Sequence, residues 1–395
     1  MKNTNLFTSE SVSEGHPDKI CDQISDAIVD AVLNLDQNAR IACETFALKN
    51  HIIITGEITT LKHPNYEKIA RDVLERIGYT SEEVGIDAKT CKVSVLLNKQ
   101  SSDIALGITR DSIYTQGAGD QGMMFGYASD ENENYMPLAI VIAHKLVRVA
   151  TSLRKEGKFK SARPDMKSQV TIDYENPAKP RVITVLMSIQ HNPDVNMDEF
   201  KNYIYKEIMI PVIASFGLNT DFKYLINPTG RFVIGGPLGD TGLTGRKIIV
   251  DTYGGYARHG GGSFSGKDPS KVDRSAAYMA RYIAKNLVAA GICKRIEIQL
   301  SYAIGVAEPI SISFSTFRTA NYSDEAILEI ITSLFDCRPG VIIKNFNLTN
   351  PSFKYEELAA YGHFGRPDLD LPWEYLDKVD EIKEFVKVKK YKRIK

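Results

Sequence analysis

A glycine-rich stretch at residues 254–273 constrains the fold of this chain more than any other part of its sequence. It contains the run Gly260-Gly-Gly-Ser-Phe-Ser-Gly-Lys-Asp-Pro-Ser-Lys271 and follows an apolar run at 247–253, which predicts a strand, a loop and a helix. Asp268 and Pro269 are typical of a helix start, so we expect the helix to begin there. Glycines allow a close backbone approach and helix starts attract anions, so the stretch predicts a polyphosphate site.

Three charged residues indicate what this loop could bind. Lys267 and Lys271 lie one turn apart and add positive charge for a phosphate chain. A carboxylate among such lysines is costly unless a divalent cation lies between it and the anion, so Asp273 is a candidate magnesium ligand. Gly261–Lys267 also matches a Walker A motif, except that Asp268 replaces the Ser or Thr that binds magnesium. A P-loop and a purely structural loop both stay open as alternatives.

The composition narrows the class of protein. The 395 residues predict two or three domains, and a 43% hydrophobic content is enough for sizeable cores. The 49 basic and 49 acidic residues give a formal net charge of zero, which does not favour a nucleic-acid or membrane-surface binder. Because the N-terminus lacks a signal-peptide pattern and no apolar run approaches about 20 residues, we expect a cytoplasmic protein. The five cysteines share no C-x2-C spacing, so we expect reduced core thiols.

One order of elements recurs three times: a helix, two strands and a second helix. The predicted ranges are 17–35, 40–48, 51–60 and 64–77, then 136–156, 169–174, 182–190 and 197–216, then 269–290, 294–304, 309–317 and 323–335. This repeat predicts an α/β fold of the α+β type, with three related units and largely antiparallel sheets. The expected divisions, which could exchange segments, are 3–101, a lid at 102–116, 117–233, 234–373 and a tail at 374–395.

A polar motif with glycine precedes each leading helix, so the three motifs could converge on one pocket. Pro17 fits the first helical position, which places His16 and Asp18 at a helix N-terminus, where an anion is favoured and a carboxylate helps to hold a cation. A helix cap and a favourable first-turn charge are the alternatives for these two residues. In the second motif, Gly117–Gly122, Asp120 could be functional or part of an ordinary turn.

Two further segments favour a charged ligand. Residues 98–116 lack periodicity but contain apolar side chains, which favours a lid over a disordered linker. Arg163–Lys167 precedes a predicted strand, and residues 227–247 combine glycines with charges and with Phe232, on which a purine could stack. Each arginine alone could be a surface ion pair, and the combination is what favours a site. The end of the chain, 383–395, is typical of a solvated helix or frayed terminus.

Three of these blocks together resemble the S-adenosylmethionine synthetases, or methionine adenosyltransferases, of the bacterial type. They are Gly15–Lys19, Gly117–Gly122 and Gly260–Lys271, and the resemblance runs from about Leu6 to Trp373. It implies attack of the L-methionine sulfur on C5′ of ATP, followed by hydrolysis of the triphosphate to phosphate and diphosphate. It also implies three pseudo-threefold related domains, two Mg²⁺ ions per site, a K⁺ ion, and a homotetramer of two dimers with active sites at the dimer interface.

The same resemblance implies roles for individual residues. His16 would stabilise the leaving oxygen, Asp18 and Asp273 would bind magnesium, and Glu44 would bind potassium. The cations around the triphosphate would be Lys167, Arg246, Lys247, Lys267 and Lys271. Asp165, Arg231, Phe232 and Ser263 would line the nucleotide, with His16, Asp120 and Asp240 also in the ATP site. The methionine contacts would be Glu57, Gln100, Asp240 and Lys271, and Asp120 would help to close the site.

Where the sequence departs from the family pattern, no charge is lost: Met166 stands where a small residue is common, and Ser263 where alanine is frequent. A neutral thioether is already nucleophilic, so the lack of a catalytic triad fits the implied reaction. A P-loop phosphotransferase or ATPase is the competing enzyme class. A non-catalytic nucleotide-binding regulator is the third interpretation, which leaves the accompanying aspartates and basic residues unexplained.

Overall fold

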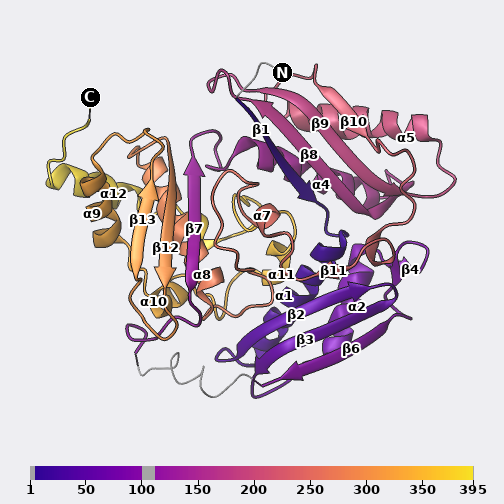
Figure 1. Cartoon of the computed structure of the whole chain (residues 1–395), viewed down its shortest axis with the longest axis horizontal. Coiled ribbons are helices and arrows are strands. Elements are labelled where there is room, and N and C mark those ends of the chain that lie inside the picture. Colours follow the sequence, from indigo (N-terminus) through magenta and orange to yellow (C-terminus); the bar gives the residue numbers. More distant parts are fainter. Residues whose placement is uncertain (1–4, 100–111, 395) are drawn as a thin grey trace.

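The computed structural model describes residues 5–99 and 112–394, in which three larger sheets carry helices packed against them (Figure 1). The strands are β1 (Leu6–Val12), β2 (Arg40–Leu48), β3 (His51–Thr59), β4 (Thr80–Ser81), β5 (Ile86–Asp87), β6 (Lys92–Asn98), β7 (Gly122–Ser129), β8 (Ala162–Asp173), β9 (Arg181–His191), β10 (Lys223–Ile226), β11 (Gly242–Leu243), β12 (Arg295–Tyr302) and β13 (Ser311–Ser315). The sheet orders are β11-β2-β3-β6, β1-β8-β9-β10 and β13-β12-β7, and β4 pairs with β5. Only the pairs β3–β6 and β9–β10 are parallel among the described strands.

The helices follow the predicted repeat closely. They are α1 (Pro17–Leu35), α2 (Tyr66–Ile77), α4 (Leu138–Lys155), α5 (Met197–Tyr203), the π-helical η1 (Ile204–Met209), α6 (Ile210–Ala214), the 3-10 turn η2 (Gly236–Leu238), α7 (Ile248–Asp251), α8 (Val272–Ala289), α9 (Asp324–Leu334), α10 (Pro339–Asn345), α11 (Tyr355–Leu358), the 3-10 turn η3 (Pro372–Glu374) and α12 (Val379–Val388). In the described residues, no helix is both long and apolar enough to pass through a bilayer. The repeat of α/β units and the mostly antiparallel sheets are therefore confirmed.

Strands are exchanged between the units. β1 comes before α1 in the chain but pairs with β8 of the second sheet, and β7 comes before α4 but pairs with β12 of the third. In the other direction, β11 returns from the third part of the chain to pair with β2 of the first sheet. These exchanges bring the polar motif that follows β1, with His16 and Asp18, next to residues 227–247, which follow β10.

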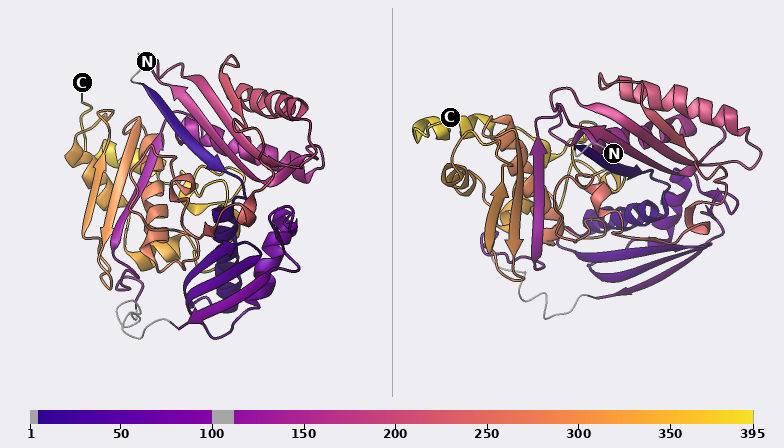
Figure 2. Two further views of the ribbon diagram at one scale, coloured as in Figure 1. Left: turned by 45° about the vertical axis from the view of Figure 1, so that its right-hand side comes forward. Right: turned by 45° about the horizontal axis from the view of Figure 1, so that its top comes forward.

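The first sheet has one covered face and one open face. Alternating residues of β2, such as Ile41, Cys43 and Thr45, are buried, whereas Glu44, between Cys43 and Thr45, is exposed. Figure 2 (right) shows α1 above this sheet and no described helix below it. Glu57 on β3 and Leu96 on β6 are also exposed, so this sheet presents a mixed polar and apolar surface in the single chain.

Three local predictions are wrong. Residues 247–253 contain the short helix α7 and no strand, because Asp251 turns inward to bind the buried ammonium of Lys19 and the segment has no strand neighbour among the described residues. Helix α8 begins at Val272 and not at Pro269, because the Asp268 carboxylate is already occupied by other donors. The segment Arg163–Lys167 lies within β8 and not before it.

Two other expectations concern burial. The cysteines Cys21, Cys43, Cys91, Cys293 and Cys337 are all buried and free, as predicted. The end of the chain differs from the expected solvated helix, because α12 buries Ile382 and Val386 against the core. Its basic residues still lie on the outside.

Candidate active site

The N-terminus of α1 begins at Pro17, as predicted, and His16 is its N-cap residue. The Nδ1 atom of His16 accepts a hydrogen bond from the backbone N–H of Asp18 at 3.2 Å, so the ring proton of the neutral imidazole lies on Nε2. Burial, and then the positive charge of Lys247, lower the pKa of His16 to about 3. The side chain is therefore neutral at physiological pH and offers one N–H donor.

Asp18 is a buried ion-pair centre and not a solvated first-turn charge. Its side chain is 1% exposed and accepts hydrogen bonds from Lys247 Nζ at 2.6 Å and from the Leu243 N–H at 3.0 Å. Arg246 Nε lies 3.4 Å from Oδ1 of Asp18, the same oxygen that accepts the Leu243 N–H. Burial by itself would raise the pKa of Asp18, but the hydrogen bond and charge of Lys247 outweigh it and lower the pKa.

Strand β8 adds further charged groups beside α1. One oxygen of Asp165 accepts a hydrogen bond from the Gly236 N–H at 2.9 Å, and the other is buried without a protein partner. Burial raises the pKa of Asp165 to about 6, with opposing charge effects from Lys167 and Asp240. The ring of Phe232 lies next to Gly235, close to the same place. We define the first cluster as His16, Asp18, Asp165, Lys167, Asp240, Arg246 and Lys247; Arg231 is an exposed neighbour of Phe232.

A second group of charges surrounds the start of α8. Lys267 Nζ pairs with Asp273 at 2.6 Å, and Lys271 Nζ pairs with Asp268 at 2.7 Å. Lys271 is buried, and Asp268 also accepts the Ile41 N–H at 2.7 Å. We define the second cluster as Lys267, Lys271 and Asp273 together with Glu44, Glu57 and Asp120.

The last three members lie around the lysine pairs. Lys267 bridges to Ala42 of β2, and Ala42 faces Glu57 of β3, so these three residues follow one another across the sheet. Glu44 points out of the same exposed face, two residues along β2. Asp120 lies in the loop whose Gly119 N–H binds the Ser270 carbonyl at 3.0 Å.

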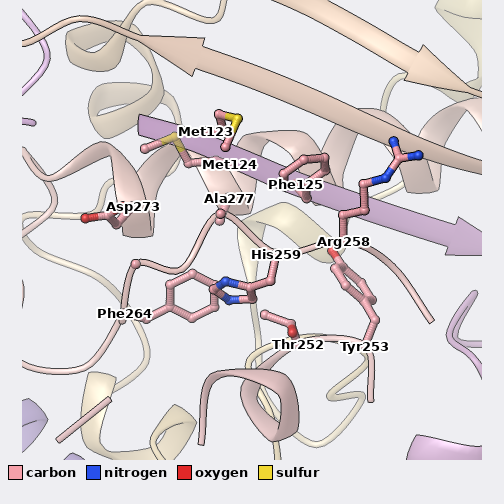
Figure 3. A pocket seen from close by; sticks show the side chains of 12 residues that line it. Met123, Met124, Phe125, Thr252, Tyr253, Arg258, His259, Phe264, Asp273 and Ala277 are labelled. Atoms are coloured by element: carbon pink, nitrogen blue, oxygen red, sulfur yellow. The ribbon is translucent and has the colours of Figure 1, made fainter. Parts of the chain in front are cut away.

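A hollow lies between β7 and the glycine-rich loop, and Figure 3 shows the residues that line it. His259 and Phe264 line one side, whereas the carboxylate of Asp273 points away from both rings. The hollow has a volume of about 10 Å³, which is room for about one water molecule. It is therefore too small for a nucleotide.

The two glycine-containing loops run end to end along the edge of β2. Residues 242–243 pair with Ala47 and Phe46, and further along the strand the Cys43 N–H binds the Gly266 carbonyl at 2.8 Å. Ser263 fills the space beside Gly245, where a Cβ atom would lie 2.7 Å from its side chain.

The two predicted magnesium ligands nevertheless belong to separate ion pairs. Asp18 binds Lys247 in the first cluster, and Asp273 binds Lys267 in the second. Across residues 5–99 and 112–394, no group of three or more His, Cys, Asp or Glu side chains could hold a metal ion.

The predicted lid and the P-loop alternative remain to be compared with the structure. Gln100 and most of the expected lid, residues 100–111, lie outside the described residues. The P-loop alternative finds no support, because the loop follows α7 instead of a strand and the Asp268 carboxylate is bound by Ile41 and Lys271.

Sequence reasoning missed a buried charge network on α1. Lys19 is fully buried and donates to Asp22 at 2.9 Å and to Asp251. Burial alone would lower the pKa of Lys19, but these two carboxylates outweigh it and raise the pKa. The sequence carries a signal for this network in aspartates spaced four residues apart, but apolar spacing alone, which predicts the helix, does not reveal it.

Comparison with known proteins identifies the family. Family models for the S-adenosylmethionine synthetase N-terminal, central and C-terminal domains match residues 4–102, 115–232 and 234–375. The S-adenosylmethionine synthase of Mesoplasma florum is 62% identical over 379 residues, covering 96% of this chain and 99% of that relative. Those of Mycoplasma mycoides and Clostridium tetani are 60% and 54% identical over 384 and 390 residues, covering 97% and 96% of this chain and 97% and 99% of the relatives. This chain belongs to the S-adenosylmethionine synthetase family.

Proposed function

We propose that this protein is a methionine adenosyltransferase that makes S-adenosylmethionine from ATP and L-methionine. The observation that carries the proposal is the first cluster, in which Asp18 holds Lys247 and Arg246 beside the neutral imidazole of His16. Fixed cations next to an uncharged N–H donor suit a leaving triphosphate. Family membership supports the same reaction.

In the proposed reaction, the methionine sulfur attacks C5′ of the ribose. The S–C5′ bond forms as the C5′–O bond breaks, and the electron pair of the broken bond leaves with the triphosphate. No general base is needed, because the sulfur carries a lone pair and no proton. Water then hydrolyses the bound triphosphate to phosphate and diphosphate.

His16 is the proposed donor to the leaving oxygen. Its Nδ1 is occupied by the Asp18 N–H, so Nε2–H is the group that can meet the negative charge developing on that oxygen. Because the pKa of His16 is lowered to about 3, the donor does not depend on protonation of the ring near neutral pH. An uncharged donor also avoids repulsion with the neighbouring cations.

The triphosphate carries about four negative charges, which the basic residues of both clusters would neutralise. The proposed set is Lys167, Arg246, Lys247, Lys267 and Lys271. Of these, Lys271 is the most buried, and its ammonium is bound by the buried Asp268. We therefore expect Lys271 to act mainly by its field and by holding the loop, and the more exposed cations to contact phosphate oxygens.

Nucleotide and methionine contacts complete the proposal. Asp165 has one buried oxygen without a protein partner, which could accept a hydrogen bond from the nucleotide, and Phe232 could stack on the base. Arg231 and Ser263 would also line the nucleotide. Methionine would be held by Glu57, Gln100, Asp240 and Lys271, with Asp120 helping to close the site.

Magnesium fits the donor atoms that are present. Mg²⁺ takes oxygen ligands and is commonly bound by one or two carboxylates together with substrate phosphates, and Asp18 and Asp273 each offer one carboxylate beside phosphate-binding cations. We propose two ions per site; when bound, they would supply positive charge to the phosphate oxygens. Glu44 is the proposed potassium ligand, and its exposed position on β2 leaves its oxygens accessible.

A second copy of the chain would complete the site. The two clusters form separate ion pairs within one chain, and the open face of the first sheet carries Glu44 and Glu57 at its surface. We therefore propose a homotetramer of two dimers, with active sites at the dimer interface and no nucleic-acid or membrane partner. A cytoplasmic location and domain boundaries at 3–101, 117–233 and 234–373 are further proposals.

The test separates attack at C5′ from phosphoryl transfer. With ATP and methionine, mass spectrometry should detect S-adenosylmethionine, phosphate and diphosphate. An ATP analogue with nitrogen in the β–γ bridge should still give one turnover, because that bridge is not broken in the first step, and then stall with the uncleaved triphosphate bound. If stoichiometric enzyme consumes ATP but makes no adenosylated methionine from the analogue, the proposed reaction is wrong.

A further inference from the structure

Four aspartates lie one turn apart along α1: Asp18, Asp22, Asp26 and Asp30. Residues at this spacing share one face of a helix, and like charges placed there repel. Asp22 and Asp26 are also fully buried, which makes an uncompensated charge costly. Each of the four accepts a hydrogen bond from the backbone of a segment far away in the chain. The row therefore fastens distant loops to a single helix.

Asp22 binds the loop that carries two cations of the first cluster. Its Oδ1 accepts the Gly245 N–H at 2.8 Å, and its Oδ2 pairs with Lys19 at 2.9 Å. Gly245 has a φ of 82°, in the left-handed region that glycine adopts most readily. Arg246 and Lys247 follow directly, so the hydrogen bond to Asp22 lies at the root of both side chains.

Asp26 repeats this arrangement one turn later. Its Oδ1 accepts the Gly266 N–H at 2.9 Å and binds the buried guanidinium of Arg274. Gly266 has a φ of 81°, nearly the same as Gly245, and Lys267 follows it directly. In both loops, a left-handed glycine bound to an aspartate of α1 immediately precedes a proposed triphosphate cation.

Asp30 provides an internal comparison. It accepts the Tyr355 and Glu356 N–H groups at 2.9 and 3.0 Å, which fastens α11 to α1. None of the five proposed triphosphate cations lies on α11. Asp30 therefore has the same kind of anchoring contact as Asp22 and Asp26, but the segment that it holds carries no proposed triphosphate cation.

We propose that Asp22 and Asp26 are positioning residues that hold the loops of Arg246, Lys247 and Lys267 in the conformation that binds the triphosphate chain. They act through the backbone of Gly245 and Gly266 and do not touch the substrate. The inference rests on the proposed function, because it assumes that those cations bind the triphosphate.

Alanine variants separate positioning from general stability. Asp22→Ala and Asp26→Ala should raise both the KM for ATP and the Kd for inorganic tripolyphosphate by about tenfold to a hundredfold, the range expected when a hydrogen bond to a charged group is lost. Asp30→Ala should change the melting temperature but neither constant, because loss of folded protein lowers the maximal rate and leaves KM unchanged. Asp22→Asn and Asp26→Asn should recover most of the affinity, because the amide oxygen can accept the same N–H. Equal KM values for all three alanine variants, or a rise in KM with Asp30→Ala as large as with the others, would overturn the proposal.

Amide exchange gives an answer even if an alanine variant does not fold. The neutral acceptor of Asp22→Asn should speed exchange in residues 243–247, and that of Asp26→Asn in residues 264–268, with no change in 353–358. Asp30→Ala, which loses the acceptor altogether, should give the reverse pattern. Unchanged exchange at 243–247 and 264–268 in the first two variants would contradict the proposal.

Lysine variants test separately whether these cations bind the triphosphate and whether Asp22 and Asp26 position them. If Lys247→Ala and Lys267→Ala leave the Kd for tripolyphosphate unchanged, the assignment of these cations is wrong and the positioning proposal fails with it. If the lysine variants weaken binding but Asp22→Ala and Asp26→Ala do not, only the positioning proposal is wrong.

Discussion

Substitution of Gly266 by alanine tests how tightly the glycine-rich loop is held against β2. A Cβ atom at this position would lie 1.8 Å from the Cys43 carbonyl oxygen, so the loop has to move. Movement would break the hydrogen bond from Cys43 to Gly266, worth about 1 kcal/mol, and the one from Gly266 to the charged Asp26, worth about 1.5–3 kcal/mol. The left-handed φ of 81° adds about 1 kcal/mol of strain for alanine. We therefore expect Gly266→Ala to destabilise the protein by about 3.5–5 kcal/mol.

Gly261 in the same loop provides the matched control. Its φ of 96° is also left-handed, but a Cβ atom there would meet nothing within 4 Å. Gly261→Ala should therefore cost only the strain, about 1 kcal/mol, partly offset by the stiffer unfolded chain. Urea unfolding of both variants measures the difference, and the KM for ATP reports whether Lys267 has moved. Equal losses of stability in the two variants would show that contact with Cys43 does not hold the loop.

Three further predictions concern α1. His16→Ala should lower kcat by about 100- to 1000-fold, as for loss of an oxyanion-type donor. Because the pKa of His16 is lowered to about 3, the pH profile of kcat for the parent enzyme should show no inflection near pH 6.5 that disappears in this variant. Asp18→Asn should lower turnover by orders of magnitude and also lower the melting temperature, because it leaves Lys247 and Arg246 without their buried carboxylate. Burial raises the pKa of Asp30 from 3.8 to about 7, so the native state retains a proton that the unfolded state loses, and stability falls as the pH rises through this range. The side chain in Asp30→Asn cannot ionise. Between pH 5 and pH 7, the free energy of unfolding of this variant in urea should therefore rise by about 2–3 kcal/mol relative to that of the parent.

Local periodicity predicted the elements whose packing is decided within one unit. Helix α1 and strands β2 and β3 have nearly the predicted bounds, because their apolar spacing matches the face that each buries. The exchanged strand β7 was missed, since glycine is rare in strands and its sequence begins Gly-Met-Met-Phe-Gly. Gly126 has a structural reason: a Cβ atom there would lie 2.0 Å from the Ala280 backbone of α8. Close helix packing requires the glycine, and only the tertiary structure reveals it.

The candidate site was predictable in residue type but not in environment. The helix start at Pro17 follows from local rules and correctly brings His16 and Asp18 together. That Asp18 would be buried, with Lys247 on one oxygen, depends on the return of β11 to the first sheet, more than 200 residues later. An ordinary first-turn aspartate and a buried ion-pair centre have the same local sequence.

The anchors of the two loops leave even less trace in the sequence. Asp22 and Asp26 bind backbone N–H groups, which every residue except proline carries, so the side chains of the partner segments do not reveal the pairing. What the sequence does retain is the conformation that the pairing requires: a glycine at 245 and at 266, each directly before a basic residue. Glycines that sequence analysis assigns to ligand approach therefore also serve to turn the backbone inward, toward a helix whose buried face carries charge.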